Sequence, residues 1–337
     1  MINKIKLSQY VPVISTCLVL LAGVALTAFL AYTKTVMMPF VIALFISMVS
    51  NTIANWMRIK WRIPRVLGLV IMVLIFLAFA TITVLFITSS IETFMQSADI
   101  YLQKLQDTVE WAVATAQHFG IKANEELLLS YLNNLPLFSM AKTMGGGIFS
   151  VFTTASLVCL FVLFMFMGRA TEKTTLESTI EKQISFYLII KIAVALLTSF
   201  LTWIVLAIVG SELLLMFTLL TFVLNFIPNI GPVISTVLPM PVLFLQYGFD
   251  WHLLLALCLL SAVHFAVGNV LETKWMGKGM DLSPVVVIAC LIFWALVWGV
   301  MGALLAVPLT SIIKMVLERS APTKPLADIL SGRLPFK

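Results

Sequence analysis

Several stretches of the sequence hold about 20 predominantly apolar residues, the length that an α-helix needs to cross the hydrocarbon core of a membrane. They are residues 11–31, 37–56, 66–88, 148–168, 184–209 and 251–271. Three further stretches are apolar but interrupted, namely residues 213–227, 233–247 and 284–317. The last is too long for one ordinary crossing and fits either one kinked helix or two half-spans. We therefore predict an all-α, polytopic bundle of about eight spans with broken or re-entrant segments.

The overall composition also indicates that the chain is surrounded by lipid. Of 337 residues, 61% are hydrophobic and only 11% are charged, whereas a soluble domain carries about 25% charged residues. The 21 Lys and Arg residues exceed the 15 Asp and Glu residues, and most of this excess sits beside the apolar stretches. Basic residues in that position hold cytoplasmic loops in place. We therefore expect membrane lipids as partners and no nucleic acid.

The orientation of the spans follows from their short basic loops. Four segments outside the spans are rich in basic residues. Before the first span these are Lys4 and Lys6, and between the second and third spans they are Arg58, Lys60, Arg62 and Arg65. After the fourth span they are Arg169, Lys173 and Lys182, and in the tail they are Arg319, Lys324, Arg333 and Lys337. The loop between the first two spans has only Lys34. The positive-inside rule then predicts that both termini are cytoplasmic. The first apolar run is too long for a signal-peptide core and lacks a good cleavage site, so we interpret it as a retained span.

Residues 89–145 are then predicted to lie outside the cytoplasm. The segment is net acidic, and its first half has heptad spacing, with Met95, Leu102, Val109 and Ala116 alternating with Ala98, Leu105, Ala112 and Phe119. This pattern predicts a helix with one apolar stripe, which docks either on the chain's own surface or on a sister subunit. Three glycines at 145–147 predict a flexible joint. The chain is therefore predicted to divide into four parts. Residues 1–88 form three spans, and residues 89–147 form an external helical segment. Residues 148–319 form a transmembrane transport region with broken helices, and residues 320–337 form a cytoplasmic tail.

Two Gly/Pro-rich breaks interrupt the apolar region at expected membrane depth. The first, at residues 225–232, reads Asn-Phe-Ile-Pro-Asn-Ile-Gly-Pro, and prolines recur at 239 and 241. The second includes Gly299, Gly302 and Pro308. Unwound backbone survives in a bilayer only where protein buries it or a wet cavity adjoins it. Paired breaks of this kind point to a transport site, although an ordinary turn with kinked helices is the structural alternative.

Ionisable residues inside spans are costly and usually functional. Lys191 lies about 10 Å into its span at 1.5 Å per residue, where it either serves function or snorkels to the surface. His264 sits in mid-span, with contact to a neighbouring helix as the simpler interpretation. Asn269 and Glu272 share a helix face, with an interfacial salt bridge to nearby lysines as the rival to a functional role.

Known catalytic signatures are absent from the sequence. It contains no GxxxxGK[ST], GxSxG or dinucleotide-binding motif, so we expect neither an ATP motor nor an enzyme. The four cysteines form no CxxC pair and the three histidines are far apart. We therefore expect no metal, no cofactor and no disulfide framework.

A set of short motifs carries a resemblance to a known family. In chain order these are Pro39-Phe40-Val-Ile-Ala43, Arg62-Ile-Pro64-Arg65, Tyr187-Leu-Ile-Ile-Lys191, Asn225-Phe-Ile-Pro-Asn-Ile-Gly-Pro232, Gly268-Asn-Val-Leu-Glu272, Met276-Gly277, Asp281-Leu-Ser-Pro-Val-Val, Phe293-Trp294 and Leu304-Leu-Ala-Val-Pro-Leu-Thr310. Over nearly its whole length the chain resembles the autoinducer-2 exporter family of bacterial membrane transporters. The resemblance implies a multi-pass inner-membrane protein, a small signalling metabolite as cargo, a role in quorum sensing, and a homo-oligomer, specifically a pentamer. Some relatives instead resemble sodium or lithium/proton antiporters.

Three functions follow as hypotheses. The first is an exporter of a small polar metabolite such as autoinducer-2, whose pathway residues are Lys191, Asn225, Pro228, Asn229, Gly231, Pro232, Ser235, Pro239, Asn269, Glu272, Pro308 and Thr310. The second is a cation/proton antiporter, with Glu272 or Glu212 as the protonating carboxylate and His264 as a further coupling residue. The third is a non-transporting membrane scaffold, which would gain nothing from the paired breaks.

Overall fold

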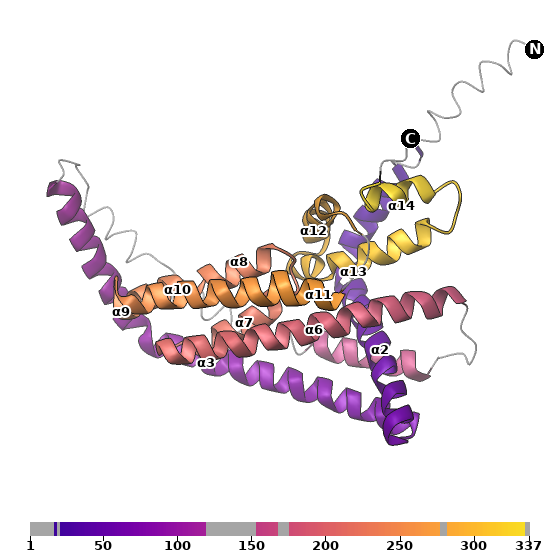
Figure 1. The fold of residues 1–337 in the computed structure, drawn as a ribbon, viewed down its shortest axis with the longest axis horizontal. Coiled ribbons are helices and arrows are strands. Elements are labelled where there is room, and N and C mark those ends of the chain that lie inside the picture. The colour runs from indigo at the N-terminus through magenta and orange to yellow at the C-terminus, as the bar shows by residue number, and fades with distance from the viewer. Residues whose placement is uncertain (1–16, 19–20, 119–152, 168–174, 277–281, 334–337) are drawn as a thin grey trace, which may run out of the picture.

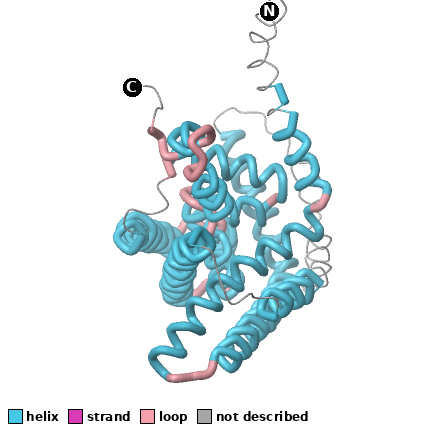
Figure 2. The backbone as a smooth tube through the Cα atoms, turned by 90° about the vertical axis from the view of Figure 1, so that its right-hand side faces the viewer, coloured by secondary structure: helices cyan, strands magenta, loops and turns pink. Residues whose placement is uncertain are grey.

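The computed structural model describes residues 17–18, 21–118, 153–167, 175–276 and 282–333. Over these residues the chain is helical, without strands, and short loops join the helices (Figure 2). The helices are Leu21–Tyr32, α2 (Lys34–Trp61), α3 (Arg65–His118), Thr153–Met167, α6 (Thr175–Val209), α7 (Leu214–Leu224), α8 (Ile230–Val237), α9 (Pro239–Tyr247), α10 (Trp251–His264), the π-helix η1 (Phe265–Leu271), α11 (Glu272–Met276), α12 (Pro284–Trp298), α13 (Val300–Leu317) and α14 (Lys324–Leu330).

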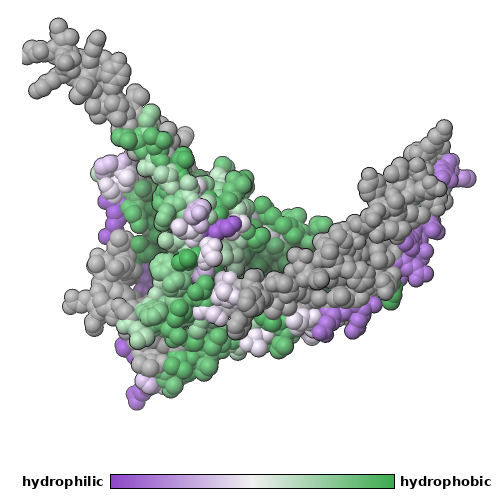
Figure 3. Space-filling view, turned by 180° about the vertical axis from the view of Figure 1, so that it is seen from behind, coloured by the Kyte–Doolittle hydropathy of each residue, from purple (hydrophilic) through white to green (hydrophobic). Residues whose placement is uncertain are grey.

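Five of the described helices are long and apolar enough to cross a membrane: Lys34–Trp61, Thr179–Val209, Ile230–Tyr247, Trp251–Met276 and Val300–Leu317. Shorter apolar helices accompany them. The surface seen in Figure 3 is hydrophobic over the body of the bundle, and hydrophilic residues gather toward its two ends. The predicted fold class, a polytopic α-helical membrane protein, is confirmed.

Helix α3 runs without interruption through the boundary that the sequence placed at residue 88. Its 54 residues correspond to roughly 80 Å at 1.5 Å per residue, far more than the ~30 Å hydrocarbon core. Its C-terminal part accordingly projects beyond the bundle (Figure 1). There Lys104 Nζ donates a hydrogen bond to the Gln246 carbonyl oxygen at 3.0 Å, which ties α3 to α9. The side chains of Leu102 and Leu105, and all of residues 119–147, lie outside the described part of the structure.

The first Gly/Pro break forms a helical hairpin. Residues 225–229 turn the chain between α7 and α8, and Asn229 adopts a left-handed φ of 62°. The two helices approach so closely that a Cβ on Gly231 would lie 1.9 Å from the Leu224 carbonyl oxygen. Only glycine permits that approach.

The second break also separates two helices, so residues 284–317 form two helical segments and not one kinked helix. Helices α12 and α13 fold back on each other around Gly299, whose φ is 68°. A Cβ on Gly302 would lie 1.9 Å from the Trp294 carbonyl oxygen. Trp294 Nε1 also donates to Thr310 Oγ1 at 3.2 Å across the pair. Leu224 and Ile227 of the first hairpin pack in one apolar cluster with this second hairpin.

The two hairpins enter the bundle from opposite ends. Tyr247 at the end of α9 donates a hydrogen bond to the Gly210 carbonyl oxygen just before α7, which closes the open end of the first hairpin. The continuous helix Trp251–Met276 starts beside that end and leads to the second hairpin (Figure 1). Opposed broken segments of this kind build substrate sites in several transporter folds.

Candidate functional site

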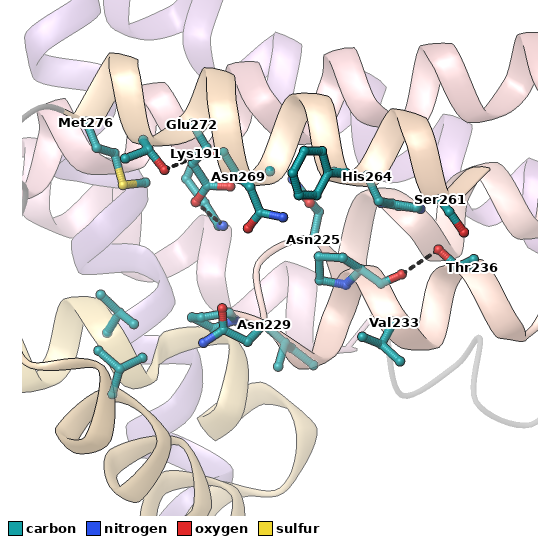
Figure 4. A pocket seen from close by; sticks show the side chains of 18 of the residues that line it. Lys191, Asn225, Asn229, Val233, Thr236, Ser261, His264, Asn269, Glu272 and Met276 are labelled. Carbon is teal, nitrogen blue, oxygen red and sulfur yellow. Dashed lines mark hydrogen bonds and ion pairs between the residues drawn. The ribbon is translucent and has the colours of Figure 1, made fainter. Parts of the chain in front are cut away.

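A cavity of about 930 Å³ lies between α6, the α7–α8 turn, α8 and the helix that runs through α10, η1 and α11 (Figure 4). Its polar lining side chains come from all of these elements: Tyr187, Lys191, Asn225, Asn229, Thr236, Ser261, His264, Asn269, Glu272 and Thr273. Apolar residues surround them. A pocket with a few convergent polar groups in an apolar wall is the usual form of a small-molecule site.

Lys191 and Glu272, which both line this cavity, form an ion pair. Lys191 Nζ lies 2.5 Å from Glu272 Oε1, and the side chains are 4% and 17% exposed. Figure 4 shows them meeting from α6 and α11. Lys191 therefore points into the protein and does not snorkel, and Glu272 has a partner other than the lysines near it in the sequence. A charged pair inside a membrane protein is costly to bury and marks functional regions.

The helix beside the cavity changes its winding at the site. Residues 265–271 form the π-helix η1, flanked directly by His264 and Glu272. Phe265, Gly268 and Asn269 of this segment all line the cavity. π-Helical turns are rare and occur frequently at functional sites.

Two buried polar groups at the cavity find no hydrogen-bond partner among the residues that the structure describes. His264 Nε2 lies 3.1 Å from Ser235 Oγ, while its Nδ1 has no partner. Asn225 is only 3% exposed, yet its Nδ2 has no acceptor. Buried polar groups nearly always find partners, and these two atoms belong to side chains that line the cavity, which makes them candidates for contact with a ligand.

Exposed apolar side chains from two helical segments line the cavity. One rim is formed by Val233 and Val237 of α8, and the other by Leu257 and Phe265. Val233 is 62% exposed and Phe265 is 64% exposed. The polar groups therefore form the floor of a groove with apolar rims.

The family description "AI-2E family transporter" matches residues 14–176 and 169–321. The chain belongs to the AI-2E transporter family. "AI-2 transport protein TqsA" of Escherichia coli K12 is 28% identical over 309 residues, covering 88% of this chain and 89% of that protein. A "Putative transport protein" of Haemophilus influenzae is 29% identical over 355 residues and covers 99% of both chains. "Putative transport protein YhhT" of Escherichia coli K12 is 33% identical over 130 residues, covering 39% of this chain and 37% of that protein.

In this AI-2E family transporter the cavity brings together many of the residues that the sequence singled out. Those that line it are Lys191, Asn225, Pro228, Asn229, Pro232, His264, Asn269 and Glu272. Ser235 lies behind His264 as its hydrogen-bond partner. Gly231 allows the hairpin to close and does not line the cavity.

The other predicted residues lie elsewhere in the AI-2E fold. Pro239 is buried at the start of α9. Pro308 and Thr310 are buried in α13, where Thr310 accepts the Trp294 hydrogen bond. Glu212 is exposed in the loop between α6 and α7 and does not line the cavity.

The site residues predicted from the sequence leave out several residues that line the cavity. Tyr187 precedes Lys191 by one turn of α6, and Ser261 precedes His264 by about one turn of α10. Helical periodicity around the chosen ionisable residues contained that signal. Thr236 follows Pro232 by four residues and donates to its carbonyl oxygen at 2.8 Å. Among the described residues, no group of three His, Cys, Asp or Glu side chains is arranged to hold a metal ion.

Proposed function

We propose that this chain exports a small polar signalling metabolite of the autoinducer-2 kind across the bacterial inner membrane, without an ATP motor of its own. The observation that carries the proposal is the cavity with its buried ion pair and the unpartnered Asn225 amide. A relative that aligns with most of the chain is named as an AI-2 transport protein. A neutral, hydroxylated cargo would satisfy the free polar groups in place of water.

The decisive test is reconstitution of the purified chain in lipid vesicles. Autoinducer-2 flux above the rate of protein-free vesicles is the expected result. Sodium- or lithium-driven proton movement, measured in parallel with a pH-sensitive dye, should stay at background. Ion-driven proton movement without autoinducer-2 flux would replace the proposal with the antiporter hypothesis, and neither activity would favour a scaffold.

Asn225→Leu should weaken transport without harming the fold. Its Nδ2 has no partner among the described residues, so removing this donor leaves no acceptor among them unsatisfied. A hydrogen bond to the cargo, worth roughly 0.5–1.5 kcal/mol, is lost. Apparent affinity should then fall several-fold. Flux normalised to folded protein, together with thermal stability in detergent, measures both effects.

Asn51→Leu is the matched control, because Asn51 is also 3% exposed but lies outside the cavity. Its Nδ2 donates to Glu181 Oε1 at 2.7 Å. This variant should lose stability and keep normal flux per folded molecule. An Asn225→Leu variant that shows the same pattern as Asn51→Leu would mean that Asn225 only supports the hairpin.

We further propose that both termini face the cytoplasm and that the end of α3 lies outside it, in a homo-oligomer for which a pentamer is the expected form. In a cysteine-free background, Gln117→Cys at the end of α3 should react with a membrane-impermeant maleimide in cells with a permeabilised outer membrane. Lys60→Cys, at the basic end of α2, should react only after lysis. The reverse labelling pattern would invert this topology.

A further inference from the structure

The ionisable groups that line the cavity compensate one another. Lys191 and Glu272 are its formally charged lining residues, and they are paired at 2.5 Å. His264 is buried, contacts the Ser235 hydroxyl through Nε2 and leaves Nδ1 unpartnered. Among the described residues this ring forms no ion pair with a carboxylate, so we count it as uncharged, because a buried charge without a partner is costly. The cavity floor therefore has a net charge near zero.

This arrangement discriminates against charged ligands of both signs. An ion that leaves water for the cavity loses hydration free energy and regains it only from a counter-charge. Both available counter-charges are already neutralised by each other. A charged ligand would have to separate the pair and leave one partner uncompensated, whereas an uncharged ligand leaves the pair closed.

The unpartnered atoms indicate what the uncharged ligand carries. Asn225 Nδ2 is a donor and requires an acceptor oxygen. His264 Nδ1 and the lining Ser261 and Asn269 side chains supply both donors and acceptors. Hydroxyl and carbonyl oxygens meet these requirements.

We propose that the Lys191–Glu272 pair acts as a charge filter, which makes the cavity selective for uncharged molecules bearing hydroxyl or carbonyl groups. The inference rests on the proposed transport function and adds the charge class of the cargo and the two residues that set it. Removing one partner gives the cavity floor a net charge, whose sign depends on which partner remains. Lys191→Met leaves the Glu272 carboxylate free for a cation, and Glu272→Gln leaves the Lys191 ammonium free for an anion.

The test uses three probes that share a six-carbon hydroxylated chain and differ in charge: D-glucitol, D-gluconate and 1-amino-1-deoxy-D-glucitol. Uptake of each labelled probe is measured in vesicles containing the full chain, with potassium and valinomycin clamping the membrane potential. The wild type should move glucitol at least tenfold faster than either ion. Lys191→Met should raise the ratio of amine flux to glucitol flux by tenfold or more. Glu272→Gln should raise the ratio of gluconate flux to glucitol flux by tenfold or more.

Two further variants control this experiment. The double variant Lys191→Met/Glu272→Gln should regain the preference for glucitol, because its floor is neutral again. Lys314→Met removes another buried lysine, 5% exposed and outside the cavity, and should leave the ratios unchanged. If a single variant fails to fold, Glu272→Asp takes its place: the shortened carboxylate loosens the pair, and the preference for glucitol should fall several-fold.

The charge filter is overturned if the wild type moves an ion as fast as glucitol, if it moves none of the probes, or if the single variants keep wild-type ratios. Autoinducer-2 flux measured in the same vesicles separates the two proposals. Autoinducer-2 flux with unchanged ratios would leave the proposed function standing and remove the filter. Shifted ratios without autoinducer-2 flux would retain the filter and remove the assigned cargo.

Discussion

Gly231→Ala is expected to prevent the α7–α8 hairpin from closing. The added Cβ would lie 1.9 Å from the Leu224 carbonyl oxygen and 2.7 Å from its carbonyl carbon. Both contacts are with backbone, so no side-chain rotation relieves them, and the helices must separate. Overpacking costs typically 1–3 kcal/mol, and we expect about 3 kcal/mol or more here because the obstacle is main chain. Thermal unfolding and the yield of monodisperse protein in detergent would measure the loss.

Gly268→Ala is the matched control for this substitution. Gly268 lines the same cavity, but among the described residues no atom outside its own stretch of helix lies within 4 Å of the position of its Cβ. Alanine also favours helical backbone over glycine, so stability should stay the same or rise slightly. If both alanine variants unfold at the same temperature, the close approach at Gly231 is not what limits the hairpin.

The sequence predicts the class of fold because every backbone N–H and C=O group in the lipid must find a hydrogen-bond partner within the protein. Long apolar runs such as residues 184–209 must become helices, since unpaired backbone is not tolerated in hydrocarbon. The breaks at residues 225–232 and at Gly299 are equally visible, because proline and glycine leave few alternatives to a turn. Those features are sufficient to locate both hairpins along the chain.

The pairing of side chains across the bundle was not predictable in the same way. Lys191 and Glu272 are 81 residues apart, and local patterns left Lys191 free to snorkel and Glu272 free to pair with Lys274. Which partner forms depends on how α6 packs against α11 and η1. The π-helix was missed for a related reason, because its one-turn change of winding leaves no distinct hydrophobic period over seven residues.

Neutralising one member of the Lys191–Glu272 pair should destabilise the protein more than neutralising both. A single substitution leaves an uncompensated buried charge, which costs about 3–5 kcal/mol in soluble proteins. We expect about 3 kcal/mol for Glu272→Gln, because it leaves Lys191, the less exposed partner at 4%. Lys191→Met should cost less, since the remaining carboxylate is 17% exposed and reaches the cavity. Thermal or denaturant unfolding of the purified variants in one detergent would give the two values.

The double variant Lys191→Met/Glu272→Gln completes a double-mutant cycle, which measures the interaction between the two side chains. Replacing both members of a buried pair by uncharged groups of similar volume is often neutral, because the desolvation penalty disappears together with the attraction. We therefore expect the double variant to be more stable than either single variant, with a coupling free energy within the 0.5–3 kcal/mol typical of contacting residues. Additive losses would show that the two side chains do not interact in the membrane-embedded protein. A double variant with near-wild-type stability would instead mean that the fold does not require this pair, and the cost of burying it would then be explained by selection for the charge of the cargo.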